Sequence, residues 1–93
     1  MVLQRYVIER DIPQIGKAAA DELAGAAAKS NEALDRLSPD VQWIESYVAA
    51  DKTFCVYLAT DEAAIRRHAE ISGFPATTIT PIATIIDPTT AKG

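Results

Sequence analysis

The sequence predicts an α+β domain in which an antiparallel four-stranded sheet carries two helices on one face. Three observations lead to this prediction: four segments rich in β-branched and aromatic residues, two amphipathic segments with helical spacing, and a very short connection between the second and third extended segments. At 93 residues, the chain suits a single domain that spans 1–93. A domain of this size gains stability when it buries more surface in an oligomer.

The first half of the chain predicts a strand and then a long helix. The segment "VLQRYVIER" (2–10) has β-branched and aromatic residues in partial alternation, and "RDIPQIG" ends the strand. The helix is expected over about 19–37, with Ser30 in line with its apolar stripe. That stripe recurs at steps of three and four residues and consists of Leu23, Ala27, Leu34 and Leu37. Pro39 follows and prevents the helix from continuing.

The second half predicts a hairpin, a second helix and a last strand. The segments "VQWIESYVAA" (41–50) and "TFCVYLA" (53–59) are joined by so short a turn that they must pair antiparallel. Thr60 is the expected cap of the second helix, and Gly73 suits the left-handed position after its end. The last strand is expected in "TTITPIATIID" (77–87), at an edge or with a bulge, because a proline within it lacks an amide donor.

The resulting order, βαββαβ, is that of the ferredoxin-like fold, in which both helices cover one sheet face and the other face is bare. A bare face that carries Trp43 or Tyr47 would be an exposed apolar patch. We therefore expect the protein to pack this face against a second copy and to form a homodimer or a higher oligomer.

Composition excludes several classes of function. The formal net charge is −4 and the sequence pI is about 4.8, which argues against a nucleic-acid-binding surface and against an anionic membrane as a partner. No apolar stretch approaches the ~20 residues of a membrane-spanning helix, and the charged N-terminal segment does not suit a secretory signal. The one cysteine, Cys55, cannot form an intramolecular disulfide, so we expect a cytoplasmic protein.

Side chains that could hold a metal ion are scattered along the sequence. No HxH, CxxC or HExxH spacing is present, so a site would have to gather distant residues or residues of two chains. The candidates are Glu9, Glu45, Asp51, Cys55 and His68. Imidazole, carboxylate and thiolate together suit nickel, zinc or copper. The alternative is that the acidic residues are ordinary solvent-exposed side chains and that His68, the only histidine, is a hydrogen-bonded residue at the border of a helix's buried stripe.

Alternation along the hairpin divides its residues between the two sheet faces. Phe54, Val56 and Leu58 form the more apolar set, which we expect to face the helices. Five other side chains would then line the open face: Trp43, Glu45, Tyr47, Cys55 and Tyr57. Its aromatic members, Trp43, Tyr47 and Tyr57, could bind a small molecule or form a dimer interface, and a cavity within an interface would satisfy both hypotheses.

Five segments together resemble a bacterial family of small proteins of unknown function, of which at least one member is described as nickel-binding. They are "YVIERDIP", "QWIESYV", "DKTFCVYLATDE", "IRRHAEISGFP" and "IIDPTT", and they span nearly the whole chain. The resemblance implies a ferredoxin-like fold, assembly into dimers or larger oligomers, and binding of a transition metal. Four positions match recurring polar residues of that family and remain the candidates for metal ligands: Glu9, Glu45, Cys55 and His68.

Three functions remain open at the level of sequence. The first is binding or sequestration of a transition metal such as nickel, which suits this histidine-poor chain better than a nickel-responsive repressor does. The second is a dimeric enzyme that acts on a small aromatic or apolar compound, for which the sequence assigns no catalytic residue. The third is a non-catalytic interaction module. The sequence favours a role that is not enzymatic.

Overall fold

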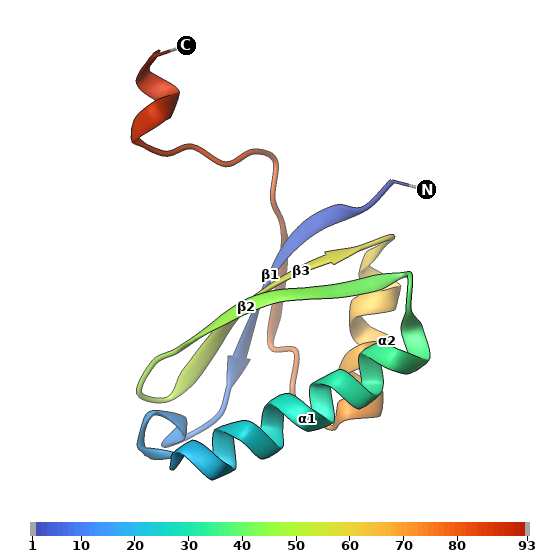
Figure 1. The fold of residues 1–93 in the computed structure, drawn as a ribbon, viewed down its shortest axis with the longest axis vertical. Coiled ribbons are helices and arrows are strands. Elements are labelled where there is room, and N and C mark those ends of the chain that lie inside the picture. Colours follow the sequence, from blue (N-terminus) through green and yellow to red (C-terminus); the bar gives the residue numbers. More distant parts are fainter. Residues whose placement is uncertain (1, 93) are drawn as a thin grey trace.

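The computed structural model describes residues 2–92 and confirms the predicted order of elements (Figure 1). Its main elements are β1 (Gln4–Asp11), α1 (Ala20–Leu37), β2 (Val41–Val48), β3 (Lys52–Ala59), α2 (Glu62–Ser72) and β4 (Thr78–Pro81), with short 3₁₀ turns η1 (Ile15–Lys17) and η2 (Pro88–Lys92). The strands pair antiparallel in the order β2-β3-β1-β4, and both helices lie on one side of the sheet. This is the ferredoxin-like α+β arrangement.

Helix α1 follows the predicted stripe. Ser30, Ala33 and Leu37 are buried against the rest of the protein. At its start the carboxylate of Glu22 accepts a hydrogen bond from the Ala19 amide (3.1 Å), which satisfies one of the amides that a helix leaves free. Sequence and structure therefore agree on the position and the buried face of this helix.

The cap of helix α2 lies one residue later than predicted. Asp61, and not Thr60, occupies the capping position, because its carboxylate accepts a hydrogen bond from the Ala64 amide at 2.9 Å. Gly73 ends the helix with a φ of 82°, in the left-handed region that glycine adopts without strain, as predicted.

The last strand is shorter than predicted. Strand β4 pairs with β1 from Thr78 to Pro81 and is an edge strand, as the proline indicated. The chain then leaves the sheet and extends away from the body of the domain toward η2 (Figure 1). Beyond Pro81 the Ile82 amide still donates a hydrogen bond to the Arg5 carbonyl (2.9 Å), and the pairing with β1 ends there.

The predicted orientation of β3 is wrong. Its buried residues are Thr53, Cys55, Tyr57 and Ala59, which face the helices. Phe54, Val56 and Leu58 lie on the open face instead. The prediction ranked the two faces by hydrophobicity alone, whereas the buried hydroxyl of Tyr57 finds a partner beneath the helices in Ser30 (3.3 Å).

A β-bulge in β2 divides the residues that were expected to line one surface. The register shifts between Trp43 and Glu45, so that Trp43 lies opposite Tyr57 and Glu45 lies opposite Val56. An extra residue in one strand reverses the side chains that follow it. Trp43 therefore faces the helices, while Glu45 and Tyr47 lie on the open face.

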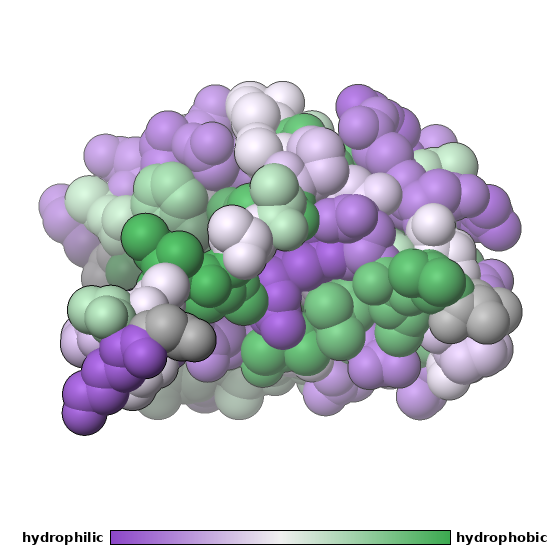
Figure 2. Space-filling model, turned by 90° about the horizontal axis from the view of Figure 1, so that it is seen from above, coloured by the Kyte–Doolittle hydropathy of each residue, from purple (hydrophilic) through white to green (hydrophobic). Residues whose placement is uncertain are grey.

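The surface keeps several large apolar side chains, and the face seen from above in Figure 2 carries separate hydrophobic regions between polar ones. The exposed residues include Ile44, Tyr47, Val48, Ile85 and Ile86. Within residues 2–92, no helix combines the length and the apolar character that crossing a membrane requires.

Candidate functional site

A cavity of about 500 Å³ lies between the first half of α1 and the helix-facing side of the sheet. Helix α1 contributes Leu23, Ala26 and Ala27 to its wall. Because alanine side chains are short, this part of the helix leaves space above the sheet that larger residues would fill. The alanine-rich sequence "AGAAAK" is thus the local cause of the cavity.

The floor of the cavity is formed by the hairpin. Trp43 and Tyr57 stack there with ring centroids 6.5 Å apart and planes inclined by 20°. Cys55 also lines the cavity and is a free, buried thiol. Of the three aromatic residues expected to share a binding surface, Trp43 and Tyr57 therefore lie together, and Tyr47 lies on the other side of the sheet.

Three buried polar side chains meet beside this floor. The Ser30 hydroxyl lies 3.3 Å from the Tyr57 hydroxyl and 3.1 Å from Nε2 of His68. The Tyr57 and His68 rings are also in contact, with centroids 5.1 Å apart. His68 thus fits the hydrogen-bonded core histidine that the sequence allowed as an alternative.

Burial is the main cause of a low pKa at His68, and the positive charge of Arg10 adds to it, so that the pKa falls from 6.5 to about 4. Burial likewise raises the pKa of the Tyr57 hydroxyl, although Ser30 and Arg10 act in the opposite direction. Both groups are therefore neutral at pH 7. Nδ1 of His68 is buried and has no hydrogen-bond partner among the described residues.

Arg10 brings a charge into the same region. Its side chain lines the cavity and is 3% exposed. Nη1 donates a hydrogen bond to the Pro75 carbonyl at 2.8 Å, and the guanidinium carbon lies 5.8 Å from the centre of the Tyr57 ring. Nη2 is buried without a hydrogen-bond partner within residues 2–92.

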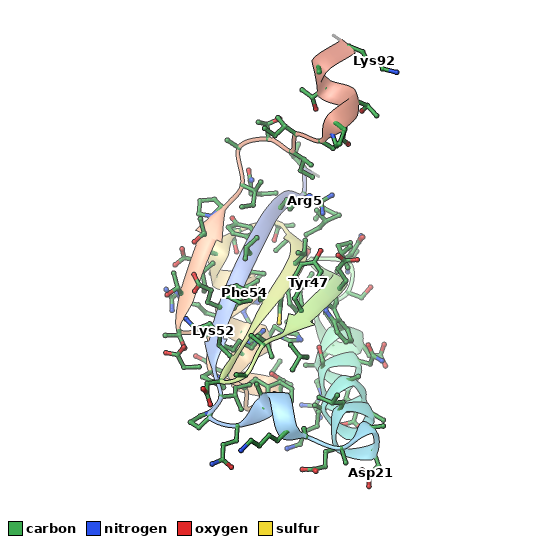
Figure 3. All side chains as sticks on the ribbon, turned by 90° about the vertical axis from the view of Figure 1, so that its left-hand side faces the viewer. Arg5, Asp21, Tyr47, Lys52, Phe54 and Lys92 are labelled. Atoms are coloured by element: carbon green, nitrogen blue, oxygen red, sulfur yellow. The ribbon has the colours of Figure 1, made fainter. Side chains whose placement is uncertain are left out.

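The open face of the sheet, on which Figure 3 labels Tyr47, Lys52 and Phe54, holds accessible carboxylates. The Lys52 ammonium lies 3.5 Å from a Glu9 carboxylate oxygen and 3.8 Å from one of Asp11. Glu45 accepts a hydrogen bond from the Tyr47 hydroxyl. This hydrogen bond, together with the negative charge of Glu45, raises the pKa of Tyr47.

The four candidate metal ligands that match the family's recurring polar residues lie on opposite sides of the sheet. Glu9 and Glu45 are on the open face, whereas Cys55 and His68 are buried beneath the helices. Across residues 2–92, no three side chains of His, Cys, Asp or Glu are grouped so that they could hold a metal ion. Asp51, the fifth candidate, accepts a hydrogen bond from the Gln14 amide (2.9 Å) at the hairpin turn.

Sequence reasoning missed two residues of this region, Arg10 and Asp11. Arg10 shares its strand face with Tyr6 and Ile8, which are buried. A charged residue in the apolar phase of a strand is a signal that the sequence carried. Asp11 is brought to Lys52 by the pairing of β1 with β3, which composition could not show.

Comparison with known proteins identifies the family of this chain. The model of the family described as nickel responsive protein SCO4226-like matches residues 6–82. No curated protein sequence gives a significant match. Among solved structures, SCO4226 from Streptomyces coelicolor A3(2) is similar in fold, with a TM-score of 0.74 and 14% sequence identity over 88% of this chain and 99% of that chain. The family model covers most of the sequence, and the chain therefore belongs to the SCO4226-like family of nickel responsive proteins.

Proposed function

We propose that the protein binds and sequesters nickel as a homodimer, with Glu9 and Glu45 as ligands on the open face of the sheet. The observation that carries the proposal is the accessibility of these carboxylates, on a face that neither helix covers. The family description supports nickel as the metal.

A single copy of the chain fits nickel poorly. Nickel favours imidazole among side-chain ligands, and the only imidazole is buried and hydrogen-bonded to Ser30. Carboxylate oxygens and water can complete six-coordination, but the described part of one chain groups fewer than three such residues. A second copy, packed sheet to sheet, would supply the missing oxygen ligands.

The pair formed by Glu9 and Asp11 favours this face for a cation. Both carboxylates lie within 4 Å of one ammonium group, that of Lys52. They are two residues apart on β1 and so project from the same side of the sheet. A divalent ion that displaced the Lys52 ammonium would gain two carboxylate oxygen ligands.

Calorimetric titration of metal-free protein with nickel chloride tests the proposal. We expect heat of binding for the native chain and affinity weaker by about tenfold or more for Glu9→Gln combined with Glu45→Gln. Glu70→Gln, at an exposed position of α2, is the matched control and should bind as the native chain does.

Two outcomes would contradict the proposal. Absence of any heat from the native chain would exclude nickel binding, and unchanged affinity in the double variant would place the ligands elsewhere. Cys55→Ser and His68→Gln separate the buried candidates from the exposed ones, since we expect neither to weaken nickel binding.

The unpaired thiol of Cys55 also leads us to propose a cytoplasmic location.

A further inference from the structure

We propose that the cavity beneath α1 binds an apolar organic monocarboxylate, whose carboxylate pairs with Arg10. This site lies on the helix-facing side of the sheet and is independent of the nickel site proposed above. Its size, about 500 Å³, is within the range of pockets that enclose small organic ligands.

The first argument is the charge of Arg10. A guanidinium is always positive at physiological pH, and this one is buried, with no carboxylate of residues 2–92 in an ion pair with it. Burial of a charge is costly unless the charge is paired and hydrogen-bonded. Nη1 is satisfied by the Pro75 carbonyl, whereas Nη2 has no partner among the same residues. An anion in the cavity that this side chain lines would supply the missing acceptor.

The second argument is the surface that the rest of a ligand would meet. Walls from η1, α1 and the α2–β4 connection are apolar and include Ile15, Leu23 and Phe74, and the floor is the stacked pair Trp43 and Tyr57. Burial of hydrocarbon against such walls contributes ~25 cal/mol for each Å² removed from water. The complementary ligand is therefore an apolar body with a single polar end.

The third argument fixes the charge of that polar end. Arg10 is the only Lys or Arg that lines the cavity among the described residues, so one negative charge balances the site and two would leave an excess. The Tyr57 hydroxyl also borders the cavity, and it is free to donate a hydrogen bond to a carboxylate oxygen when Ser30 donates to Tyr57. A guanidinium with a hydroxyl donor beside it suits a carboxylate.

Octanoate is a suitable probe, with 1-octanol as its neutral counterpart and inorganic phosphate as a polar anion. Trp43 is the only tryptophan in the chain and lies in the cavity wall, so its fluorescence reports occupancy directly. Titrations are made in EDTA, which keeps metal binding out of the measurement. We expect octanoate to change the Trp43 emission and to raise Tm, and to bind about tenfold or more tightly than 1-octanol.

Substitutions identify the site. Arg10→Met should weaken octanoate binding by about tenfold or more and leave 1-octanol binding unchanged, because it removes the charge and keeps an apolar side chain of similar length. Ala27→Leu should weaken the binding of both ligands, since the larger side chain fills part of the cavity while Arg10 is retained. Arg66→Met, on the exposed side of α2, is the control and should behave as the native chain.

Three results would overturn the proposal: no octanoate binding to the native chain, equal binding of octanoate and 1-octanol, or equal octanoate binding to the native chain and Arg10→Met. Stronger stabilisation by phosphate than by octanoate would also overturn it, in favour of a polar anion. If Arg10→Met does not fold, Arg10→Lys replaces it, with weakened octanoate binding as the expected result, since an ammonium cannot reproduce the guanidinium fork.

Discussion

The hydroxyl oxygen of Ser30 on α1 lies 3.1 Å from Nε2 of His68 on α2, and 3.3 Å from the hydroxyl of Tyr57 on β3. One serine side chain therefore ties both helices to the sheet. A hydroxyl has only one proton to donate, so at least one of its two partners must donate to the serine oxygen. The three groups form a single buried hydrogen-bonded unit.

Removal of the serine hydroxyl should destabilise the protein. Ser30→Ala leaves the Tyr57 hydroxyl and His68 Nε2 buried without the partner that the structure gives them, and we expect a loss of about 1–3 kcal/mol in the free energy of unfolding. Urea denaturation followed by circular dichroism measures it. Asn31→Ala, at the neighbouring exposed position, should change stability by less than about 0.5 kcal/mol. Equal losses in the two variants would show that the cluster contributes nothing.

His68 should make the protein sensitive to mild acid. Its pKa of about 4 in the folded protein lies below the ordinary 6.5, so the unfolded chain takes up this proton first as the pH falls. The contribution of His68 to stability is present above about pH 6.5 and is lost progressively down to pH 4, by ~3 kcal/mol in total.

Unfolding by urea at pH 7.0 and pH 4.5 separates His68 from the carboxylates. In His68→Gln, which retains a polar side chain near Ser30, the difference in free energy of unfolding between the two pH values should be smaller than in the native chain by ~2–3 kcal/mol. The same pH dependence in both proteins would show that His68 titrates normally in the folded state.

Two glycines should respond oppositely to alanine. At Gly16 a Cβ would lie 2.7 Å from the Ala49 carbonyl oxygen and 2.8 Å from the Ala50 Cα, both backbone atoms that cannot move alone. Gly16→Ala should therefore destabilise η1 against the hairpin by about 1–3 kcal/mol. At Gly25, inside α1, a Cβ meets nothing within 4 Å, and Gly25→Ala should stabilise by about 0.5–1 kcal/mol. Thermal denaturation measures the change in Tm of each variant, which should fall for Gly16→Ala and rise for Gly25→Ala. A Tm for Gly16→Ala at or above that of the native chain would contradict the close approach of η1 to the hairpin.

The sequence predicted the order of elements because the signals are local. Helical spacing placed α1 within a residue of its observed start, and Gly73 marked the end of α2. The orientation of the hairpin could not be predicted in the same way, because it depends on pairing across the fold. Ile44 is the extra residue at the bulge, and nothing in its immediate sequence distinguishes it from a regular strand residue.

The error in the orientation of β3 explains why residues predicted to share one surface lie on opposite faces of the sheet. Hydrophobicity ranks Phe54, Val56 and Leu58 above Cys55 and Tyr57, yet it is the polar-tipped set that the helices cover. Tyr57 is favoured there by Ser30 and by the Arg10 guanidinium, two partners distant in sequence. The more apolar face of β3 is consequently the bare one.

That bare face leads to the last prediction, which concerns assembly. Val56 lies at its centre, opposite Val7 on β1 and Glu45 on β2, and a second copy of the chain is the occupant we expect. Val56→Lys should convert a dimer into a monomer, because burial of an ammonium in a sheet-to-sheet interface carries a desolvation cost that one carboxylate partner, Glu45, does not offset. Light scattering after size-exclusion chromatography measures the mass of each form. Ala63→Lys, exposed on α2, should leave the dimer intact. A native chain that elutes as a monomer would contradict the interface, and a dimer that survives Val56→Lys would place it on another surface.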